Sequence, residues 1–449
     1  MKQTENSTGL DYSHGNITDL FRKIFFPTLL GMLFNALITI VDGIFVGRGV
    51  GADGIAAVNI IAPLYMVVTG VGLMFGIGSS VISGIVLSQG DSRRASINMT
   101  QAMGVSGILI TLLCIILTFW PERVAGRLGC SANLLPKALD YLLWLIPGMF
   151  FLLFQVIGMM VIRLDGSPKF AMMCNVLPAI INIILDWILV FPMNMGVKGA
   201  AIATSASILI GALMVLTYFL RFSFVMKFVW SGNNLLSNIW RQICIGSSAF
   251  ITEIAMSVMM LTGNYVFMKY YGEAGVAAYS IACYLFPLMF MMCNAVAQSA
   301  QPIISYNYGA NAMDRVREAF KVSIRVALIC GGIVTISIAL AADHIVALFI
   351  DPECEAGLLA SEGLPVYSLC AIFFGVNISF IGYFQSIEKA VKAAVFTLLR
   401  GVIYLVPLFL ILPSLWHGKG AWAAIPASEI LTFITICITY AVSRRGNNA

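Results

Sequence analysis

Three acidic residues lie inside long apolar stretches of the sequence: Asp42, Asp186 and Glu253. A carboxylate at bilayer depth costs roughly 2.5–3.5 kcal/mol on insertion scales, so it persists there when it meets a partner, a water-filled cavity or an ion path. Only 10% of the residues are charged. These acids therefore predict where the chain does its chemistry, and that chemistry is the binding of cations or protons.

The first two acids belong to a group of oxygen-bearing side chains that predicts a cation site. Asn182 precedes Asp186 by one helical turn and shares its face. A rise of about 1.5 Å per residue places Asp42, Asp186 and Thr204 at similar depth in their predicted spans. Two carboxylates, an amide and a hydroxyl suit a hard monovalent cation such as Na⁺. Two alternatives stay open: the carboxyl groups share one proton, or Asp42 pairs structurally with Arg48.

The third acid predicts a substrate site. Glu253 lies near the middle of a predicted span, and Met256 and Met260 follow it by one and two turns. An acid beside adaptable methionine side chains suits a lipophilic cation, to which aromatic rings add cation–π contact. The amides Asn35 and Asn377 are further predicted substrate contacts. Ordinary helix packing is the alternative for the methionines.

The elements that position these residues are transmembrane helices. The chain has 449 residues, of which 60% are hydrophobic, and a mean hydropathy of +0.93. Apolar runs of about 20 residues recur throughout, which predicts an all-α polytopic membrane protein. We predict twelve spans, over residues 24–47, 55–82, 97–120, 135–160, 168–192, 197–220, 242–268, 275–305, 319–342, 361–386, 393–415 and 419–442.

The two halves of the chain carry similar motifs. Residues 54–57 (GIAA) match residues 275–278 (GVAA), and at the same offset Pro192 matches Pro413. We interpret this as a duplication that gives two pseudo-symmetric six-helix bundles: a lobe over 1–220, a cytoplasmic linker over 221–241 and a lobe over 242–449. Transporters built from such repeats bind substrate between the halves. The alternative is that small residues recur because they let helices pack closely.

Several function classes are disfavoured. None of the three histidines falls in a predicted span, so we expect no enzyme and no catalytic residues. No glycine-rich segment ends in GK[ST], so no phosphate loop is predicted. An ion gradient or the membrane potential must then supply the energy, unless a partner subunit supplies ATP. We expect no cofactor beyond the coupling ion, no nucleic-acid partner and a monomer surrounded by membrane lipid. Lys and Arg concentrate on one side of the spans, which predicts that both termini are cytoplasmic.

The chain resembles the multidrug and toxic compound extrusion (MATE) family over essentially its whole length, closest to the bacterial branch with the DinF and MepA types. The matching segments are Pro27, residues 42–48 (DGIFVGR), 54–57 (GIAA), 89–90 (QG), Asn182 with Asp186, 196–201 (GVKGAA), 301–302 (QP) and 307–309 (NYG). The resemblance implies a pair of six-helix bundles in the bacterial inner membrane that export organic cations in exchange for sodium ions or protons.

The resemblance also implies roles for single residues. In the family, an acid in the first span, Asn and Asp in the fifth and Thr in the sixth form the cation site of the N-terminal lobe. Asp42, Asn182, Asp186 and Thr204 match them. Some relatives use a seventh-span acid, which Glu253 matches, together with an acid in the tenth span.

The tenth span here has Asn377 and no acid between Glu362 at its outer end and Glu388 near its inner end, so coupling is expected through Asp42 and Asp186. The leading prediction is thus a secondary antiporter for amphipathic, cationic compounds. The alternative is a flippase or exporter of a lipid-linked or polar precursor. Arg400 in the eleventh span either neutralises an acid or extends to the interface.

Overall fold

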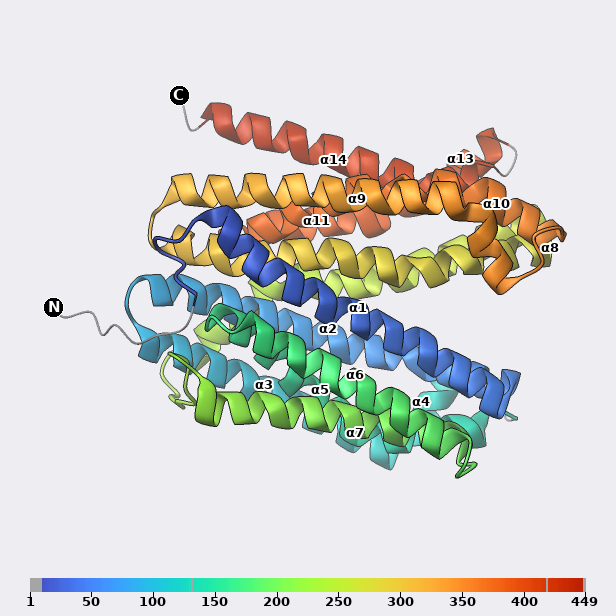
Figure 1. The fold of residues 1–449 in the computed structure, drawn as a ribbon, viewed down its shortest axis with the longest axis horizontal. Coiled ribbons are helices and arrows are strands. Elements are labelled where there is room, and N and C mark those ends of the chain that lie inside the picture. The colour runs from blue at the N-terminus through green and yellow to red at the C-terminus, as the bar shows by residue number, and fades with distance from the viewer. Residues whose placement is uncertain (1–9, 129, 131–132, 417–418, 447–449) are drawn as a thin grey trace. The chain divides into compact units, whose positions relative to one another are not determined.

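A computed structural model describes residues 10–128, 130, 133–416 and 419–446, without the side chains of residues 39, 47, 52–53, 55–56 and 440–446. All regular secondary structure in these ranges is helical (Figure 1). Seven α-helices and a π-helical segment come first: Ile17–Val50 (α1), Ala52–Ser88 (α2), Ser92–Phe119 (α3), Pro121–Arg127 (α4), Leu135–Leu164 (α5), Pro168–Val190 (α6), Gly196–Thr217 (α7) and Tyr218–Phe222 (η1).

The remaining elements follow an extended segment over residues 223–234. They are Leu235–Gly309 (α8), Met313–Phe349 (α9), Glu355–Ser368 (α10), Cys370–Ser386 (α11), Ala390–Leu398 (α12), the π-helical Leu399–Ile403 (η2), Leu405–Leu415 (α13) and Gly420–Gly446 (α14).

The described helices account for twelve spans. Eleven are long and apolar enough to cross a membrane. The longest, α8, is two helices joined at Gly272, whose φ of 63° and ψ of −152° are not helical. Glycine reaches this left-handed region without the steric cost that a Cβ atom brings. The two spans predicted over 242–268 and 275–305 therefore meet at this break, and the prediction of twelve spans is confirmed.

Contacts group the chain into two compact units. The N-terminal unit contains residues 1–250 and 302–316, and the C-terminal unit contains 251–301 and 317–449. Residues 235–250 at the start of α8 and its last turns thus belong to the N-terminal unit, while residues 251–301 of α8 belong to the C-terminal unit. The predicted lobe boundaries at residues 220 and 242 stay a prediction.

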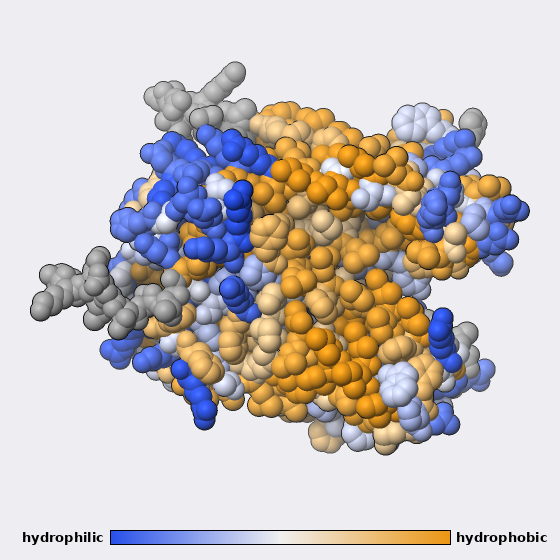
Figure 2. Space-filling model, viewed as in Figure 1, coloured by the Kyte–Doolittle hydropathy of each residue, from blue (hydrophilic) through white to orange (hydrophobic). Residues whose placement is uncertain are grey.

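On the face shown in Figure 2, hydrophobic side chains cover the middle of the helices and hydrophilic ones gather at their ends.

Glycines let α1 and α6 approach closely inside the N-terminal unit, where they run side by side (Figure 1). A Cβ atom on Gly31 would lie 3.3 Å from the side-chain nitrogen of Asn175, and one on Gly49 would overlap Val190. Since both numbers rise together along the two helices, α1 and α6 are parallel. Small residues at such contacts are the usual means of close packing between transmembrane helices, and this packing positions the site.

Candidate functional site

Asp42 of α1 and Asp186 of α6 face each other inside the N-terminal unit. Their carboxyl groups lie close enough to interact electrostatically. Asp186 is completely buried, and Asp42 is half-buried with its Oδ1 enclosed. Two carboxylates this close repel each other when both are ionised, so the arrangement requires a proton or a cation between them.

The polar atoms around this pair lack partners. Five buried atoms have no hydrogen-bond partner within the described ranges. They are both carboxyl oxygens of Asp186, Oδ1 and Nδ2 of Asn182, and Oδ1 of Asp42. Asn182 is 1% exposed. A buried polar group without a partner costs free energy, and a cation bound by these oxygens would remove that cost. The residues therefore fit a Na⁺ or proton site.

Two further residues, Thr204 and Arg48, were predicted to lie near Asp42 and Asp186. Thr204 lies on α7, which packs against α1 and α6, and it is half-buried. Its hydroxyl makes no hydrogen bond to Asp42, Asn182 or Asp186 in the described part of the chain. Arg48 is exposed and forms no ion pair with Asp42 among the described residues, so the structural-pair alternative for Asp42 finds no support.

One neighbour of the acids was missed by the sequence analysis. Tyr141 of α5 is 7% exposed, and its phenol lies close enough to interact electrostatically with both Asp42 and Asp186. Tyr65 of α2 lies close to the same phenol. A tyrosine in an apolar span gives little signal in sequence, because Tyr is also a common packing residue.

The predicted substrate residues are spread over both units. In the C-terminal unit, the Glu253 carboxylate is 8% exposed and accepts no hydrogen bond from a described residue. Met256 packs at the edge of the core of this unit, and Met260 is 37% exposed. Asn377 is completely buried. Asn35, in the N-terminal unit, is exposed on α1.

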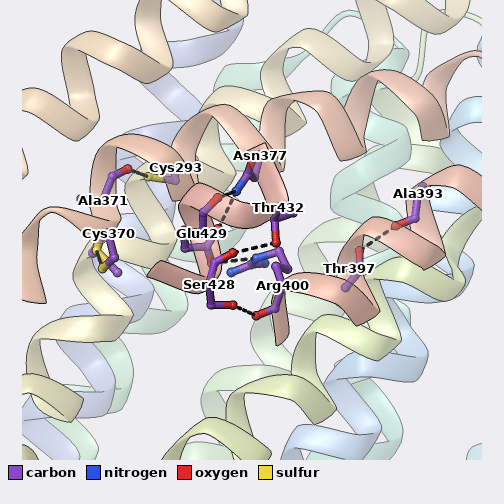
Figure 3. Close-up of polar contacts among 11 residues, drawn as sticks. Cys293, Cys370, Ala371, Asn377, Ala393, Thr397, Arg400, Ser428, Glu429 and Thr432 are labelled. Atoms are coloured by element: carbon purple, nitrogen blue, oxygen red, sulfur yellow. Dashed lines mark hydrogen bonds and ion pairs between the residues drawn. The ribbon is translucent and has the colours of Figure 1, made fainter. Parts of the chain in front are cut away.

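A second buried polar cluster lies in the C-terminal unit (Figure 3). Arg400 donates through Nε to Oε1 of Glu429 at 2.9 Å, and Asn377 donates through Nδ2 to Oε2 of the same carboxylate at 2.8 Å. The guanidinium lies 4.2 Å from the ring centre of Phe374. Arg400 thus neutralises an acid, which decides between its two predicted roles.

Local backbone geometry presents Arg400 to this acid. It lies in the π-helical segment η2, and its carbonyl accepts a hydrogen bond from Oγ of Ser428 on α14 at 2.7 Å. Single π-helical turns inside α-helices are frequent at functional sites. Glu429, one residue further along α14, is a buried acid within a span that the sequence analysis overlooked. Its signal was available, because it lies well inside the span predicted over 419–442.

Comparisons with known proteins agree with this architecture. The MatE family model matches residues 27–188 and 248–410. The chain is similar to the Multidrug export protein MepA of Staphylococcus aureus, at 26% identity over 93% of this chain and 92% of that protein. The protein of the same name from Staphylococcus saprophyticus is 24% identical, with the same coverage.

Solved structures show the same fold. One is an outward-facing multidrug resistance MATE family transporter of the MOP superfamily, with a TM-score of 0.90 and 21% identity over 98% of this chain and all of that one. Another is a MOP superfamily transporter from Pyrococcus furiosus, also with a TM-score of 0.90 and 21% identity, over 98% of both chains. The predicted fold class is therefore confirmed. These relatives are transporters and not enzymes, and since the family model covers most of the chain, the chain belongs to the MatE family.

Proposed function

We propose that this protein is a secondary antiporter that exports amphipathic organic compounds in exchange for Na⁺ or H⁺. The observation that carries the proposal is the facing pair Asp42 and Asp186, with the unpartnered amide of Asn182 beside it. Thr204 is the fourth proposed ligand. The MepA relatives are named multidrug export proteins, which supports the export of several compounds.

Coupling follows from the electrostatics of this pair. When both carboxyl groups are ionised, α1 and α6 carry facing negative charges along a tightly packed parallel contact. Binding of Na⁺ or a proton neutralises the repulsion and favours close packing of the two helices. Ion occupancy thus selects between two packings of α1, which contains Pro27 within its length. A difference in ion affinity between two states is what allows an ion to shift their equilibrium.

The substrate side of the proposal rests on Glu253. A buried carboxylate without a hydrogen-bond partner in the described chain favours a positively charged ligand, and the flexible side chains of Met256 and Met260 adapt to different shapes. Asn35 and Asn377 stay predicted contacts. Because Asn377 donates a hydrogen bond to Glu429, its amide can contact substrate only as part of the cluster with Glu429 and Arg400.

The chain is a multi-pass membrane protein. We infer that it lies in a bacterial cytoplasmic membrane with both termini on the cytoplasmic side, as the distribution of Lys and Arg predicts. A monomer surrounded by lipid is the proposed working form, since the predicted duplication gives one chain both six-helix bundles.

Efflux from proteoliposomes tests the proposal. A fluorescent aromatic cation is loaded, a sodium gradient is imposed at constant pH, and a proton gradient is then imposed at constant sodium. Acceleration by one gradient is expected and identifies the coupling ion. If neither gradient moves the cation while a lipid-linked anionic precursor is flipped across the same membrane, the antiporter assignment is wrong and the flippase alternative is correct.

A further inference from the structure

A groove on the N-terminal unit has no place in the proposed transport cycle. Its cavity of about 690 Å³ lies between α3, α5 and α7, and the extended segment over 223–234 contributes Phe228 and Trp230 to its wall. The wall is largely apolar. Its hydroxyl groups are satisfied within α3: Thr111, for example, donates to the carbonyl of Gly107 at 2.7 Å. The groove therefore offers hydrocarbon contact rather than hydrogen bonds.

The wall formed by the extended segment is held in place. The backbone N–H of Val229 donates to Oγ1 of Thr100 at 3.0 Å, and that of Lys227 donates to Oγ of Ser96 at 3.1 Å. A Cβ atom on Gly104 would lie 2.8 Å from the ring of Trp230, so the indole lies directly on α3. The segment thus builds a fixed side of the groove.

The groove is continuous with the lipid-facing surface. Among its lining residues, Ile108 is 61% exposed, Leu112 is 54% exposed and Leu213 is 50% exposed. All three belong to helices long and apolar enough to span a membrane. Within a bilayer such side chains meet acyl chains, so the material that reaches the groove is lipid.

One end of the groove is basic. Lys227 hydrogen-bonds to α3 at Ser96, one helical turn or about 6 Å nearer the start of α3 than Thr100, which lines the groove. Arg93 and Arg94 lie in the first turn of the same helix. All three basic side chains are exposed, and none pairs with an acidic side chain among the described residues. Basic groups beside a membrane-facing pocket attract anionic lipid head groups.

We propose that the groove binds one acyl chain of an anionic phospholipid, with the phosphate beside Lys227 and Arg94. The apolar wall accounts for the chain, and the unpaired cations at one end account for the charge of the head group. Because Phe228 and Trp230 belong to the segment that leads into α8, the bound lipid packs against the connection between the two halves of the chain.

Native mass spectrometry with phosphatidylglycerol tests the proposal. Gly107 lines the groove, and a Cβ atom there would meet no atom within 4 Å, so we expect Gly107→Phe to place its ring in the groove. Gly332 of α9 is equally open and half-buried, and Gly332→Phe is the matched control. We expect one retained phosphatidylglycerol in the wild type and the control, and a loss of about tenfold or more in its retention in Gly107→Phe. Equal retention in all three proteins would overturn the site.

Two further measurements separate chain from head group. The double variant Lys227→Gln, Arg94→Gln should remove the preference for phosphatidylglycerol over phosphatidylcholine of the same chains. An unchanged preference would overturn the assignment of the head group.

Phosphatidylglycerol with brominated chains tests the position of the acyl chain. We expect it to quench a component of the tryptophan fluorescence that is absent in Trp230→Phe. The same quenching in Trp230→Phe would place the lipid elsewhere. Displacement of the lipid by the exported cation would show that the groove is a substrate site and would overturn the proposal.

Discussion

Arg400 and Glu429 form an ion pair of 2.9 Å whose side chains are only 8% and 4% exposed. The two residues come from the π-helical segment η2 and from α14, and Asn377 of α11 completes the hydrogen bonding of the carboxylate. The pair has no net charge. Its burial in the C-terminal unit is therefore tolerated only as long as both partners are present.

Removing one partner of this pair should be costly. Arg400→Gln leaves Glu429 as an uncompensated buried charge, and breaking a buried pair in this way typically costs roughly 3–5 kcal/mol. Thermal unfolding in detergent should show a strongly lowered midpoint. The double variant Arg400→Gln, Glu429→Gln should recover most of the loss. Lys419→Gln is the control, because it breaks an exposed pair with Glu362 at 3.8 Å. A single variant as stable as the control would show that the pair is not needed.

Neutralising either acid of the N-terminal unit should uncouple transport. In Asp42→Asn or Asp186→Asn the remaining carboxylate faces an amide, so neither Na⁺ nor a shared proton is held as before. We expect gradient-driven efflux to fall by about tenfold or more, corresponding to about 1.4 kcal/mol or more of lost ion affinity. Asp140→Asn, at an exposed position early in α5, should leave efflux unchanged. Wild-type coupling in both acid variants would remove these residues from the mechanism.

Glu253→Gln should distinguish cationic from neutral substrates. The amide keeps the size of the side chain but loses its negative charge, so a cationic dye should bind more weakly, with KM raised about tenfold. Transport of an uncharged compound of similar shape should change little. Glu273→Gln, at the exposed break in α8, is the control. Equal losses for the cationic and the neutral compound would indicate a structural role for Glu253.

Asp165 predicts a pH dependence of stability at the end of α5. Its carboxylate accepts hydrogen bonds from the hydroxyl of Tyr218 and from three backbone N–H groups of residues 224–226, at 2.8 to 3.0 Å. Burial raises its pKa above the ordinary 3.8, and these hydrogen bonds offset the rise only in part. A raised folded-state pKa means that stability is greatest below the unfolded pKa and falls as the pH rises through the folded value.

The matching variant is Asp165→Asn, which loses hydrogen bonds and does not titrate. We expect it to be less stable than the wild type at neutral pH, with faster hydrogen exchange over residues 223–234. The difference in thermal midpoint should widen as the pH falls from about 7 toward about 4, because only the wild type gains stability by protonation. Asp19→Asn, an exposed position on α1, should show no such trend. A gap that narrows on acidification would contradict the direction of the pKa shift.

The sequence by itself determined the class of the protein and the number of spans, and it named the candidate residues for binding a cation. Apolar runs of span length are read directly from hydropathy, and acids within them are conspicuous because they are expensive there. The ends of the helices were less accurate. The second span was predicted over 55–82, whereas α2 is Ala52–Ser88, because residues 83–88 (SGIVLS) are still largely apolar and hydropathy marks no sharp end there.

The tertiary structure decided which of these residues meet. Asp42 and Asp186 face each other because glycines on α1 allow parallel packing on α6, a contact between segments far apart in the chain. The partner of Arg400 was likewise beyond the sequence, because Glu429 lies on another helix and the π-helical turn that presents the guanidinium has no sequence signature. The periodicity of apolar residues indicates which face of a helix is buried. It does not indicate which helix packs against that face, and the pairing of charges depends on that packing.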